Sequence, residues 1–429
     1  MKKYYLNNLE NIDDLLRRPG SDASSVMLVV QEIMVNVREN GDDALQEYSM
    51  KFDGVEIDSL KVADFETAWD RVDERVKNAM MLAADNIKKF HAAQITPPLE
   101  IETMPGVKCS RVSRPIERVG LYIPGGTAPL PSTVLMLAIP AVLAGCEEII
   151  LCSPPFIADE ILCAAKIAGV NKIYQIGGAQ AIAAMAYGTE SIPKVDKIFG
   201  PGNQYVTAAK MLVQAEGVAI DMPAGPSEVL IIADREARAD FVASDLLSQA
   251  EHGPDSQVVL VCTDEAKADE VLEEMDAQLA VLPRKDIAAE ALNNSFVLIV
   301  DNLDQAMEFS NQYAPEHLIL NVENPDTDSI KNAGSVFLGQ YSCESAGDYA
   351  SGTNHTLPTY GYAKSYSGVS VDSFVKKITF QELTKEGVKN IGPAVEILAE
   401  CEGLQAHKNA MTLRLNQIKL GKLEKTFRS

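Results

Sequence analysis

The chain has 429 residues, and its 61 acidic and 38 basic side chains leave a formal net charge of −23. This charge repels phosphate backbones and anionic lipid, so the composition argues against a nucleic-acid or membrane-surface protein and favours a small-molecule partner. Apolar residues make up 46% of the chain, which is typical of a globular protein, and the length predicts two or more folded units.

The cysteines and the N-terminal residues predict a cytoplasmic protein. Seven cysteines are scattered along the chain without a CxxC pair, and the start MKKYYLNNLENIDDLL lacks a signal-peptide pattern. Reduced thiols in the cytoplasm fit this usage. Residues 119–146 carry no charge, but four prolines interrupt them. We therefore expect a buried strand, loop and helix there, and no membrane segment.

The first part of the chain is expected to be helical. Apolar residues recur three and four positions apart in residues 12–18, 25–52 and 65–94, which is the spacing of one helix face. His91 stands beside lysines in the last of these segments and is expected to face solvent.

From about Arg118 onward, short β-branched runs alternate with helical runs, as in βα units on a parallel sheet. The predicted strands are residues 120–123, 147–152, 172–176, 195–199, 228–234, 257–262 and 295–300. Periodicity alone does not distinguish one large doubly wound sheet from two smaller sheets, and we favour two. After Ser373 the pattern is helical again.

Glycine-rich turns follow several of the predicted strands, at IPGG from position 123, IGG from 176 and FGPG from 199. Each turn places free N–H groups at the carboxyl end of a strand, where α/β sheets bind ligands. None completes the GxGxxG fingerprint, because Tyr205 stands where the third glycine after Gly200 and Gly202 would be. The turns predict a non-standard nucleotide site, with ordinary tight βα turns as the alternative.

Polar residues around the histidines predict a metal site. Gln249 and His252 are three positions apart near an expected helix end, so both side chains can point at one centre. Asp348 and His407 would add an oxygen and a second nitrogen. Such a mixed set suits zinc or another borderline divalent ion. The alternative is that these residues are separate and satisfied in the surface or core.

The neighbours Glu316 and His317 form a candidate acid–base pair. A carboxylate can activate water, and a neutral imidazole can take the proton of a hydroxyl group. The alternative is a solvated helix start, which Pro315 would suit. No GxSxG, HExxH or Walker motif occurs, which argues against the commonest serine hydrolases, zincins and P-loop proteins.

Longer segments resemble the histidinol dehydrogenase family, in the same order and over nearly the whole chain. They are RPIERVGLYIPGGTAPLPSTVLMLAIPA, GGAQAIAAMAYGT, FGPGNQYVTAAK, DMPAGPSEVLI, DLLSQAEHGPDSQ, APEHL, CESAGDYASGTNHTLPTYG and EGLQAHKNA. The resemblance implies an α/β fold of two incomplete Rossmann-like domains with parallel sheets. It also implies a zinc-containing homodimer that oxidises L-histidinol to L-histidine in two NAD-dependent steps, through histidinaldehyde, at the end of histidine biosynthesis.

The resemblance also assigns roles to particular residues. The implied zinc ligands are Gln249, His252, Asp348 and His407. The implied acid–base pair is Glu316 and His317. Substrate contacts come from the zinc ligands and from Ser227, His317 and Glu402. The implied NAD contacts, one in each glycine-rich turn region, are Tyr122, Gln180 and Asn203.

The predicted organisation has four parts. They are an N-terminal helical segment of residues 1–20, a first α/β domain of 21–118 and 229–309, a second Rossmann-like domain of 119–228 and 310–372, and a helical tail of 373–429. The family forms intertwined dimers, so the tail is expected to exchange between subunits and to complete each active site with Glu402 and His407.

Three other functions are alternatives to histidinol oxidation. A related zinc and NAD dehydrogenase acting on another amino or sulfonated alcohol would share the fold. A metal-dependent hydrolase could use Glu316 and a metal-bound water, but the three NAD positions argue against it. A non-catalytic binding protein would not need the pair Glu316 and His317.

Overall fold

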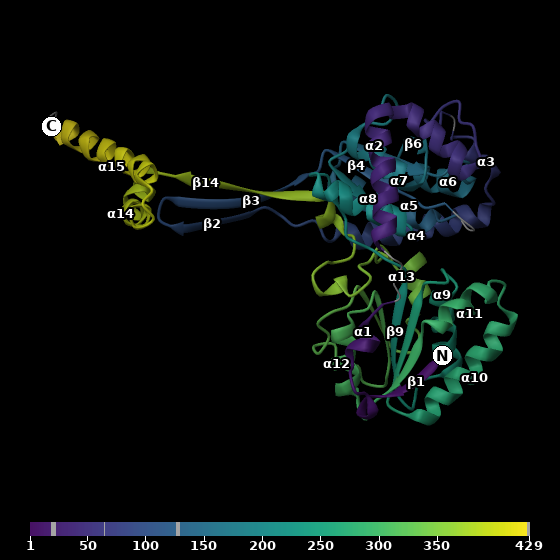
Figure 1. Ribbon diagram of the computed structural model, residues 1–429. Helices are drawn as coiled ribbons and strands as arrows, with labels where there is room; N and C mark the ends of the chain where they lie inside the picture. Colours follow the sequence, from purple (N-terminus) through teal and green to yellow (C-terminus); the bar gives the residue numbers. More distant parts are fainter. Residues whose placement is uncertain (19–22, 64, 126–128, 427–429) are drawn as a thin grey trace. The chain divides into compact units, whose positions relative to one another are not determined.

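The computed structural model describes residues 1–18, 23–63, 65–125 and 129–426. It divides into two compact units (Figure 1). The first unit contains Met1–Gln94 and Ile116–Phe374, and the second contains Ile95–Pro115 and Val375–Ser429.

One parallel sheet of the first unit has five strands in the order β6-β5-β4-β7-β8. They are β4 (Arg118–Tyr122), β5 (Glu148–Ser153), β6 (Lys172–Gln175), β7 (Lys197–Phe199) and β8 (Ala219–Ile220). Counted along the chain, this order is 3-2-1-4-5, the Rossmann order without its last strand. The order changes direction between β4 and β7, which is where such sheets bind ligands.

The other parallel sheet has six strands in the order β1-β11-β10-β9-β12-β13. They are β1 (Lys2–Tyr5), β9 (Glu228–Ala233), β10 (Gln257–Cys262), β11 (Phe296–Ile299), β12 (His317–Asn321) and β13 (Ser335–Leu338). Apart from β1, which adds an edge strand, the order is again 3-2-1-4-5. The prediction of two incomplete Rossmann-like domains with parallel sheets is therefore confirmed.

Helices cover both faces of the five-stranded sheet. They are α2 (Ala23–Tyr48), α3 (Ala68–Arg71), α4 (Glu74–Ala92), α5 (Pro131–Ala144), α6 (Asp159–Ala168), α7 (Gly178–Tyr187) and α8 (Gln204–Ala215). Alternate residues of β5 enter opposite cores: Ile150 packs with α2, α7 and α8, whereas Leu151 packs with α4, α5 and α6. This alternation is the two-residue period of a strand that is buried on both faces.

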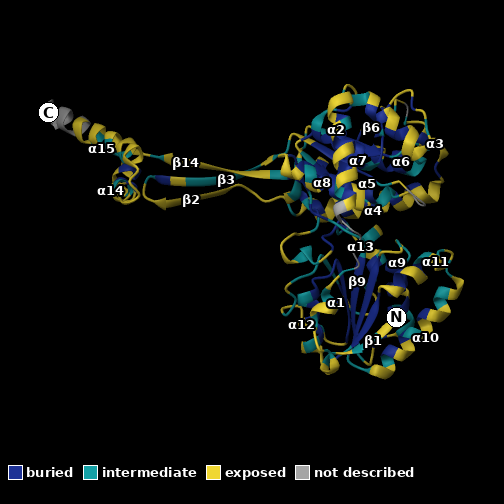
Figure 2. Ribbon diagram, viewed as in Figure 1, coloured by how far each residue is buried: buried dark blue, intermediate teal, exposed yellow. Residues whose placement is uncertain are grey.

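The six-stranded sheet is also covered on both faces. Its helices are α1 (Asp13–Leu16), α9 (Ala239–Ala250), α10 (Glu265–Val281), α11 (Lys285–Asn293), α12 (Leu303–Tyr313) and α13 (Glu344–Tyr349). Val229 and Ile231 of β9 face α9, α10 and α11, while Leu230 and Ile232 face α1 and α12. Figure 2 accordingly shows β9 as a buried strand.

The second unit is an antiparallel sheet followed by two helices. Its strands are β2 (Leu99–Met104), β3 (Val107–Pro115) and β14 (Val375–Leu383), in the order β14-β3-β2, and its helices are α14 (Lys385–Cys401) and α15 (Gln405–Thr426). Large apolar side chains remain exposed on it, including Ile101 at 55%, Ile397 at 66% and Leu413 at 69%.

The structure groups the chain differently from the predicted domain boundaries. Residues 23–92 pack on the five-stranded sheet and not with residues 229–309. Residues 317–338 supply β12 and β13 to the six-stranded sheet, and β1 lies within the predicted helical segment 1–20. The tail after Ser373 begins with β14 and is not helical throughout. An amphipathic pattern shows which face of a helix is buried but not which sheet covers it.

The prediction that His91 faces solvent is wrong. Its side chain is fully buried, and Nδ1 lies 2.9 Å from the carbonyl oxygen of Ile87. His91 shares the buried face of α4 with Met80, Ala84 and Ile87, so the helical period outweighs the neighbouring lysines. Among the described residues, no helix combines the length and the apolar character that a membrane crossing requires.

Candidate active site

Glu316 and His317 lie at the amino end of β12, beside β9. Their exposed fractions are 6% and 3%, and His317 is paired with Val229 in the parallel register. The alternative of a solvated helix start at Pro315 is therefore wrong, because the chain enters a buried strand at this point.

The main chain of Glu228 holds both members of this pair. Its N–H donates to Oε2 of Glu316 at 2.9 Å, and its carbonyl oxygen lies 3.3 Å from Nδ1 of His317. A carbonyl oxygen only accepts, so this contact places a proton on Nδ1. Nε2 of His317 then faces Asp348, whose Oδ1 is 3.3 Å away.

Carboxylates and a second histidine gather beside His317. One potential ligand atom from each of His252, Glu344 and Asp348 lies within 4.8 Å of the others. His252 follows α9, while Glu344 and Asp348 are one turn apart on α13. The structure thus brings together two of the predicted zinc ligands with Glu344, which the sequence analysis missed. The signal was the four-residue spacing between Glu344 and Asp348.

Gln249, a third predicted ligand, lies in the last turn of α9. Its Nε2 is 3.4 Å from Oε2 of Glu316. With the amide turned over, its nitrogen donates to Oε1 of Glu344 at 2.5 Å and its oxygen accepts from the N–H of Glu228 at 3.0 Å. Gln249 thus bonds to Glu316 in one orientation, and to Glu344 and the main chain of Glu228 in the other.

The cluster fits a divalent cation. Among the described residues, the buried Oε2 of Glu344 has no hydrogen-bond partner, and the buried Oδ1 of Asp348 and Nε2 of His317 face only each other, 3.3 Å apart. Buried polar atoms are rarely left without a partner. Carboxylate oxygens with an imidazole form a ligand set that zinc accepts.

The charged groups at the site change one another's pKa values. Burial lowers the pKa of His317, but the carboxylates of Glu344, Glu316 and Asp348 outweigh it and raise the pKa well above its usual value. Burial also raises the pKa of Glu344, whereas for Asp348 the contact with His317 outweighs burial and lowers the pKa. The site therefore favours a negative Asp348 next to an imidazole that accepts protons readily.

His355, which the sequence analysis left without a role, supports the cluster. Its Nδ1 lies 2.8 Å from the carbonyl oxygen of Asp348, and its Nε2 lies 3.1 Å from Oγ1 of Thr133 on α5. His355 is half-buried, and desolvation lowers its pKa. His355 thus connects the six-stranded sheet's cluster to a helix of the five-stranded sheet.

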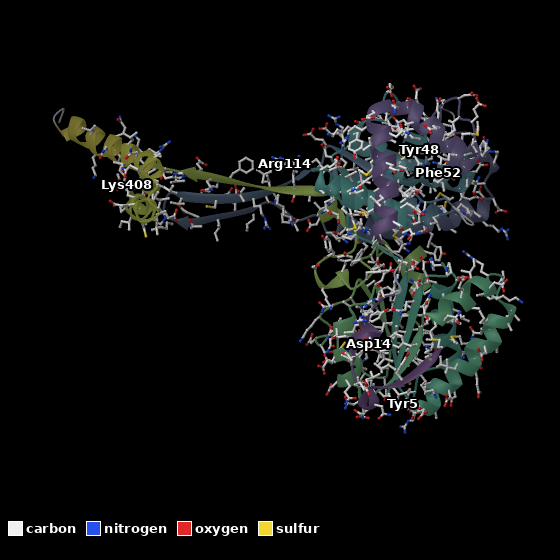
Figure 3. The ribbon with its side chains drawn as sticks, viewed as in Figure 1. Tyr5, Asp14, Tyr48, Phe52, Arg114 and Lys408 are labelled. Carbon is white, nitrogen blue, oxygen red and sulfur yellow. The ribbon has the colours of Figure 1, made fainter. Side chains whose placement is uncertain are left out.

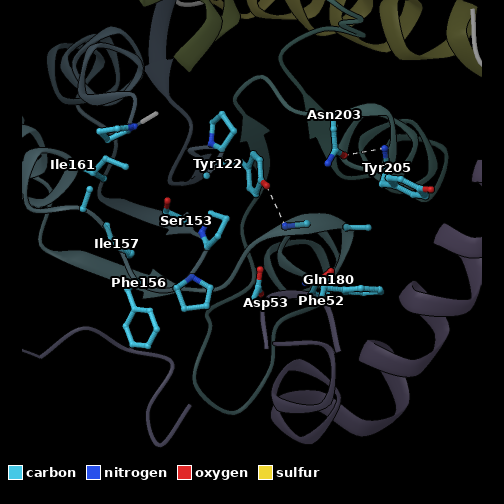
Figure 4. Close-up of a pocket in the computed structure, with 18 of the residues that line it drawn as sticks. Phe52, Asp53, Tyr122, Ser153, Phe156, Ile157, Ile161, Gln180, Asn203 and Tyr205 are labelled. Atoms are coloured by element: carbon cyan, nitrogen blue, oxygen red, sulfur yellow. Dashed lines mark hydrogen bonds between the residues drawn. The ribbon is translucent and has the colours of Figure 1, made fainter. Parts of the chain in front are cut away.

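A cavity of about 760 Å³ opens at the carboxyl ends of the five-stranded sheet (Figure 4). All three predicted NAD contacts, Tyr122, Gln180 and Asn203, line it. The hydroxyl oxygen of Tyr122 accepts from the N–H of Gly178 at 3.1 Å. Asn203 begins α8, and its side-chain oxygen accepts from the N–H groups of Tyr205 and Val206 at 3.0 and 3.1 Å.

The glycine-rich turns shape this cavity. At Gly200 φ is +126°, and a Cβ there would overlap the carbonyl oxygen of Tyr122. Only glycine lets the ends of β4 and β7 approach so closely. The predicted turn that follows β4 includes residues 126–128, which lie outside the described residues.

The remaining predicted site residues lie in different places. Ser227 directly precedes Glu228 at the start of β9, and its carbonyl oxygen accepts from the N–H of Gln257 at 3.2 Å. Glu402, at the end of α14, and His407, in α15, are exposed residues of the second unit. The first unit therefore assembles the cluster without them.

Comparison with known proteins gives one consistent result. Residues 16–415 match the family model described as histidinol dehydrogenase. Histidinol dehydrogenase of Pectobacterium atrosepticum is 55% identical over 419 residues, covering 96% of this chain and 95% of that protein. The Escherichia coli K12 enzyme is 56% identical over 412 residues, covering 94% and 95%. The crystal structure of histidinol dehydrogenase from Elizabethkingia anophelis superposes with a TM-score of 0.95 at 53% identity, covering 98% and 99%.

Proposed function

Because the chain belongs to the histidinol dehydrogenase family, we propose that this oxidoreductase converts L-histidinol to L-histidine with NAD as the hydride acceptor. The oxidation proceeds in two steps through histidinaldehyde. The observation that carries the proposal is the buried pair of Glu316 and His317, held by the main chain of Glu228 next to a cluster of cation ligands.

In the first step His317 acts as the general base. Its Nε2 takes the proton of the substrate hydroxyl group while the carbon transfers hydride to NAD, which yields histidinaldehyde and NADH. The carbonyl of Glu228 keeps the other ring nitrogen protonated, so Nε2 is the nitrogen that is free to accept. The carboxylates around the ring stabilise the imidazolium that forms.

In the second step Glu316 activates water. Its carboxylate takes a proton from the water as the water oxygen adds to the aldehyde carbon, and the imidazolium of His317 gives its proton to the carbonyl oxygen, which yields a hydrate. The neutral His317 then takes one hydroxyl proton while the hydrate transfers hydride to a second NAD. The carboxylic acid that forms loses its proton to solvent to give histidine. The short bond from the Glu228 N–H fixes the orientation of Glu316, and burial keeps bulk water away from the reactive aldehyde.

We further propose that zinc is held by Gln249, His252 and Asp348, with His407 as the ligand from the second unit. Since NAD carries the redox chemistry, the ion supplies a positive centre that binds the amine and imidazole of histidinol. Among the described residues, Oδ1 of Asp348 has no polar partner besides the ring of His317, which supports this role. Ser227 and Glu402 are proposed as additional substrate contacts.

We propose that the protein is a homodimer in which the second unit of one subunit completes the site of the other. The exposed apolar side chains of the second unit support this proposal, because a protein surface with many exposed apolar side chains is usually covered by a partner. Glu402 and His407 lie on the same unit.

The test separates the two oxidations. Replacing Glu316 by Gln should slow the oxidation of histidinaldehyde far more than that of histidinol, whereas replacing His317 by Asn should slow both by roughly 10²–10⁴-fold. NADH formation from each substrate measures the rates. If Glu316→Gln slowed both oxidations equally, Glu316 would not have a separate role in the second step. If the wild-type enzyme preferred another amino or sulfonated alcohol, the assignment of histidinol as its substrate would be wrong.

A further inference from the structure

The wall of the cavity has an unusual charge pattern. Among the described residues that line it, Asp53 is the only carboxylate, and none is Lys, Arg or His. A dinucleotide brings a negatively charged pyrophosphate into such a site. Here residues at the amino ends of α7 and α8 line the cavity, so the positive ends of both helix dipoles lie beside that group. The cavity thus provides no side-chain cation for any further phosphate.

Asp53 reaches the cavity from outside the sheet. It ends the helical segment Ser49–Asp53 that follows α2, and Gly54, with φ +68°, turns the chain away directly afterwards. The ring of Phe52 in this segment stacks on the ring of Tyr48, the last residue of α2, with 5.5 Å between the ring centres and an angle of 3° between their planes; both residues are labelled in Figure 3. Ile57 and Leu60 then return the chain to the buried core. These contacts fix the position of the carboxylate at the cavity (Figure 4).

The end of β5 lacks the acidic residue that a standard Rossmann domain places there. In that fold an Asp or Glu about 20 residues beyond the first glycine turn binds the adenosine ribose. Here β5 ends in Ser153, and Pro154, Pro155 and Phe156 follow in the cavity wall. None of these residues is acidic, so among the described lining residues Asp53 alone can supply a carboxylate.

We propose that Asp53 accepts hydrogen bonds from the ribose diol of the dinucleotide and excludes a ribose 2′-phosphate, so that the cavity selects NAD over NADP. The inference rests on the proposed use of NAD by this enzyme. Asp53 is exposed to solvent, its carboxylate has no hydrogen-bond partner among the described residues, and partial desolvation raises its pKa. The ribose hydroxyl groups can therefore donate to this carboxylate, whereas a ribose 2′-phosphate would be repelled by its charge, since no lining side chain among the described residues is a cation.

The experiment compares kcat/KM for NAD and NADP, with histidinol as substrate. In Asp53→Asn the ratio of NADP to NAD should rise by roughly tenfold or more, because repulsion is removed and a charge-assisted hydrogen bond is lost. Asp53→Glu keeps the charge and should retain much of the preference for NAD. Asp58→Asn is the matched control, since Asp58 is an exposed acid five residues further on and does not line the cavity. Its ratio should equal that of the wild type.

The outcomes separate this inference from the proposed function. A wild-type enzyme that reduces NAD with histidinol but uses NADP equally well would overturn the role of Asp53 alone. The role of Asp53 would also be overturned if a folded Asp53→Asn protein, as shown by thermal unfolding, kept the wild-type ratio of kcat/KM for NADP to that for NAD. If the wild type reduces neither dinucleotide with histidinol, the proposed function fails first. Direct binding of NAD and NADP by calorimetry then still tests whether Asp53 selects between them.

Discussion

The carboxyl group of Asp245 is buried in α9, with an exposed fraction of 8%, and burial raises its pKa to about 7. In the unfolded chain this group titrates near its usual value. Between about pH 4 and pH 7 the folded state therefore binds more protons than the unfolded state, and the free energy of unfolding falls as pH rises. Above pH 7 the full cost of a charged Asp245 is present, up to about 4 kcal/mol for a shift of about three pKa units.

Replacing Asp245 by Asn should therefore stabilise the metal-free protein at pH 8 and leave its stability nearly unchanged at pH 4. Thermal unfolding at both pH values measures the difference. Asp276→Asn is a suitable control, because Asp276 is exposed on the neighbouring helix α10. An equal effect of Asp245→Asn at both pH values would show that its charge is not the cause.

Replacing His252 by Asn tests the metal site. His252 is exposed, so the change opens no cavity in the core, and the melting temperature of the metal-free protein should stay close to that of the wild type. Loss of a residue that only hydrogen-bonds to a metal ligand lowers metal affinity by roughly 10–100-fold, so loss of a ligand itself should lower it at least as much. Elemental analysis after dialysis measures bound zinc. Full zinc occupancy in the variant would exclude His252 as a ligand.

Arg18 and Glu228 connect the chain's start to the amino ends of the central strands. Their side chains are 7% and 2% exposed, and Nη2 lies 2.8 Å from Oε2. The guanidinium also stacks 3.3 Å from the centre of the Tyr313 ring and donates to the Tyr313 carbonyl at 2.7 Å. The other carboxylate oxygen of Glu228 accepts from the N–H of Tyr360. This ion pair thus anchors the residue that holds Glu316 and His317.

Removing one charge of this pair should be costly. Arg18→Met leaves a buried carboxylate without its partner, which typically costs about 3–5 kcal/mol. Its kcat should also fall, because the main chain of Glu228 loses its anchor. The double variant with Glu228→Gln has no buried charge at this place and should regain part of the lost stability. Urea denaturation and steady-state kinetics measure both effects, and a double variant no more stable than Arg18→Met would contradict the explanation.

The sequence predicted the strands that can be recognised from their own composition, as continuous β-branched runs. All seven predicted strands occur, from β4 to β11, because buried strands of a parallel sheet are continuous β-branched runs. The other strands among the described residues were missed, namely β1, β2, β3, β8, β12, β13 and β14. β1 and β12, for example, are defined by pairing with strands far away in the chain, β11 and β9 respectively, and Pro315 gave β12 the appearance of a helix start.

The site residues were also hard to predict wherever their contacts join segments that are far apart in the chain. Gln249 and His252 could be linked by local spacing, but their approach to Glu316 and Asp348 depends on the register between β9 and β12 and on the placement of α13. No local pattern carries that information. The resemblance to a family proposed these residues together. The roles of His355 and of the Glu228 main chain emerged only from the three-dimensional contacts. Glu344 was also recognised there, although its four-residue spacing from Asp348 is visible in the sequence.

At the scale of the whole molecule, the proposed dimer predicts complementation. A His317→Asn subunit and a His407→Asn subunit should each be inactive as homodimers. If the second unit completes the partner's site, a mixed dimer has one site with both lesions and one with none. Random reassociation of equal amounts should then restore roughly a quarter of wild-type activity.

Subunit exchange must be shown independently, for example with two affinity tags on the two variants. Exchanged dimers without activity would show that each subunit completes its own site. A mixture of two His317→Asn preparations serves as the negative control, since no arrangement of its subunits gives an intact site.

The dinucleotide cavity and the carboxylate–histidine cluster are built on different sheets. Under the proposed function each turnover uses two NAD molecules, so one reduced dinucleotide leaves and a fresh one enters midway. None of the described residues that line the cavity belongs to the cluster, so this exchange need not loosen the groups that hold the aldehyde. Each histidinol molecule should therefore be committed to both oxidations, and isotopically labelled histidinol should give histidine with undiluted label even when unlabelled histidinaldehyde is added.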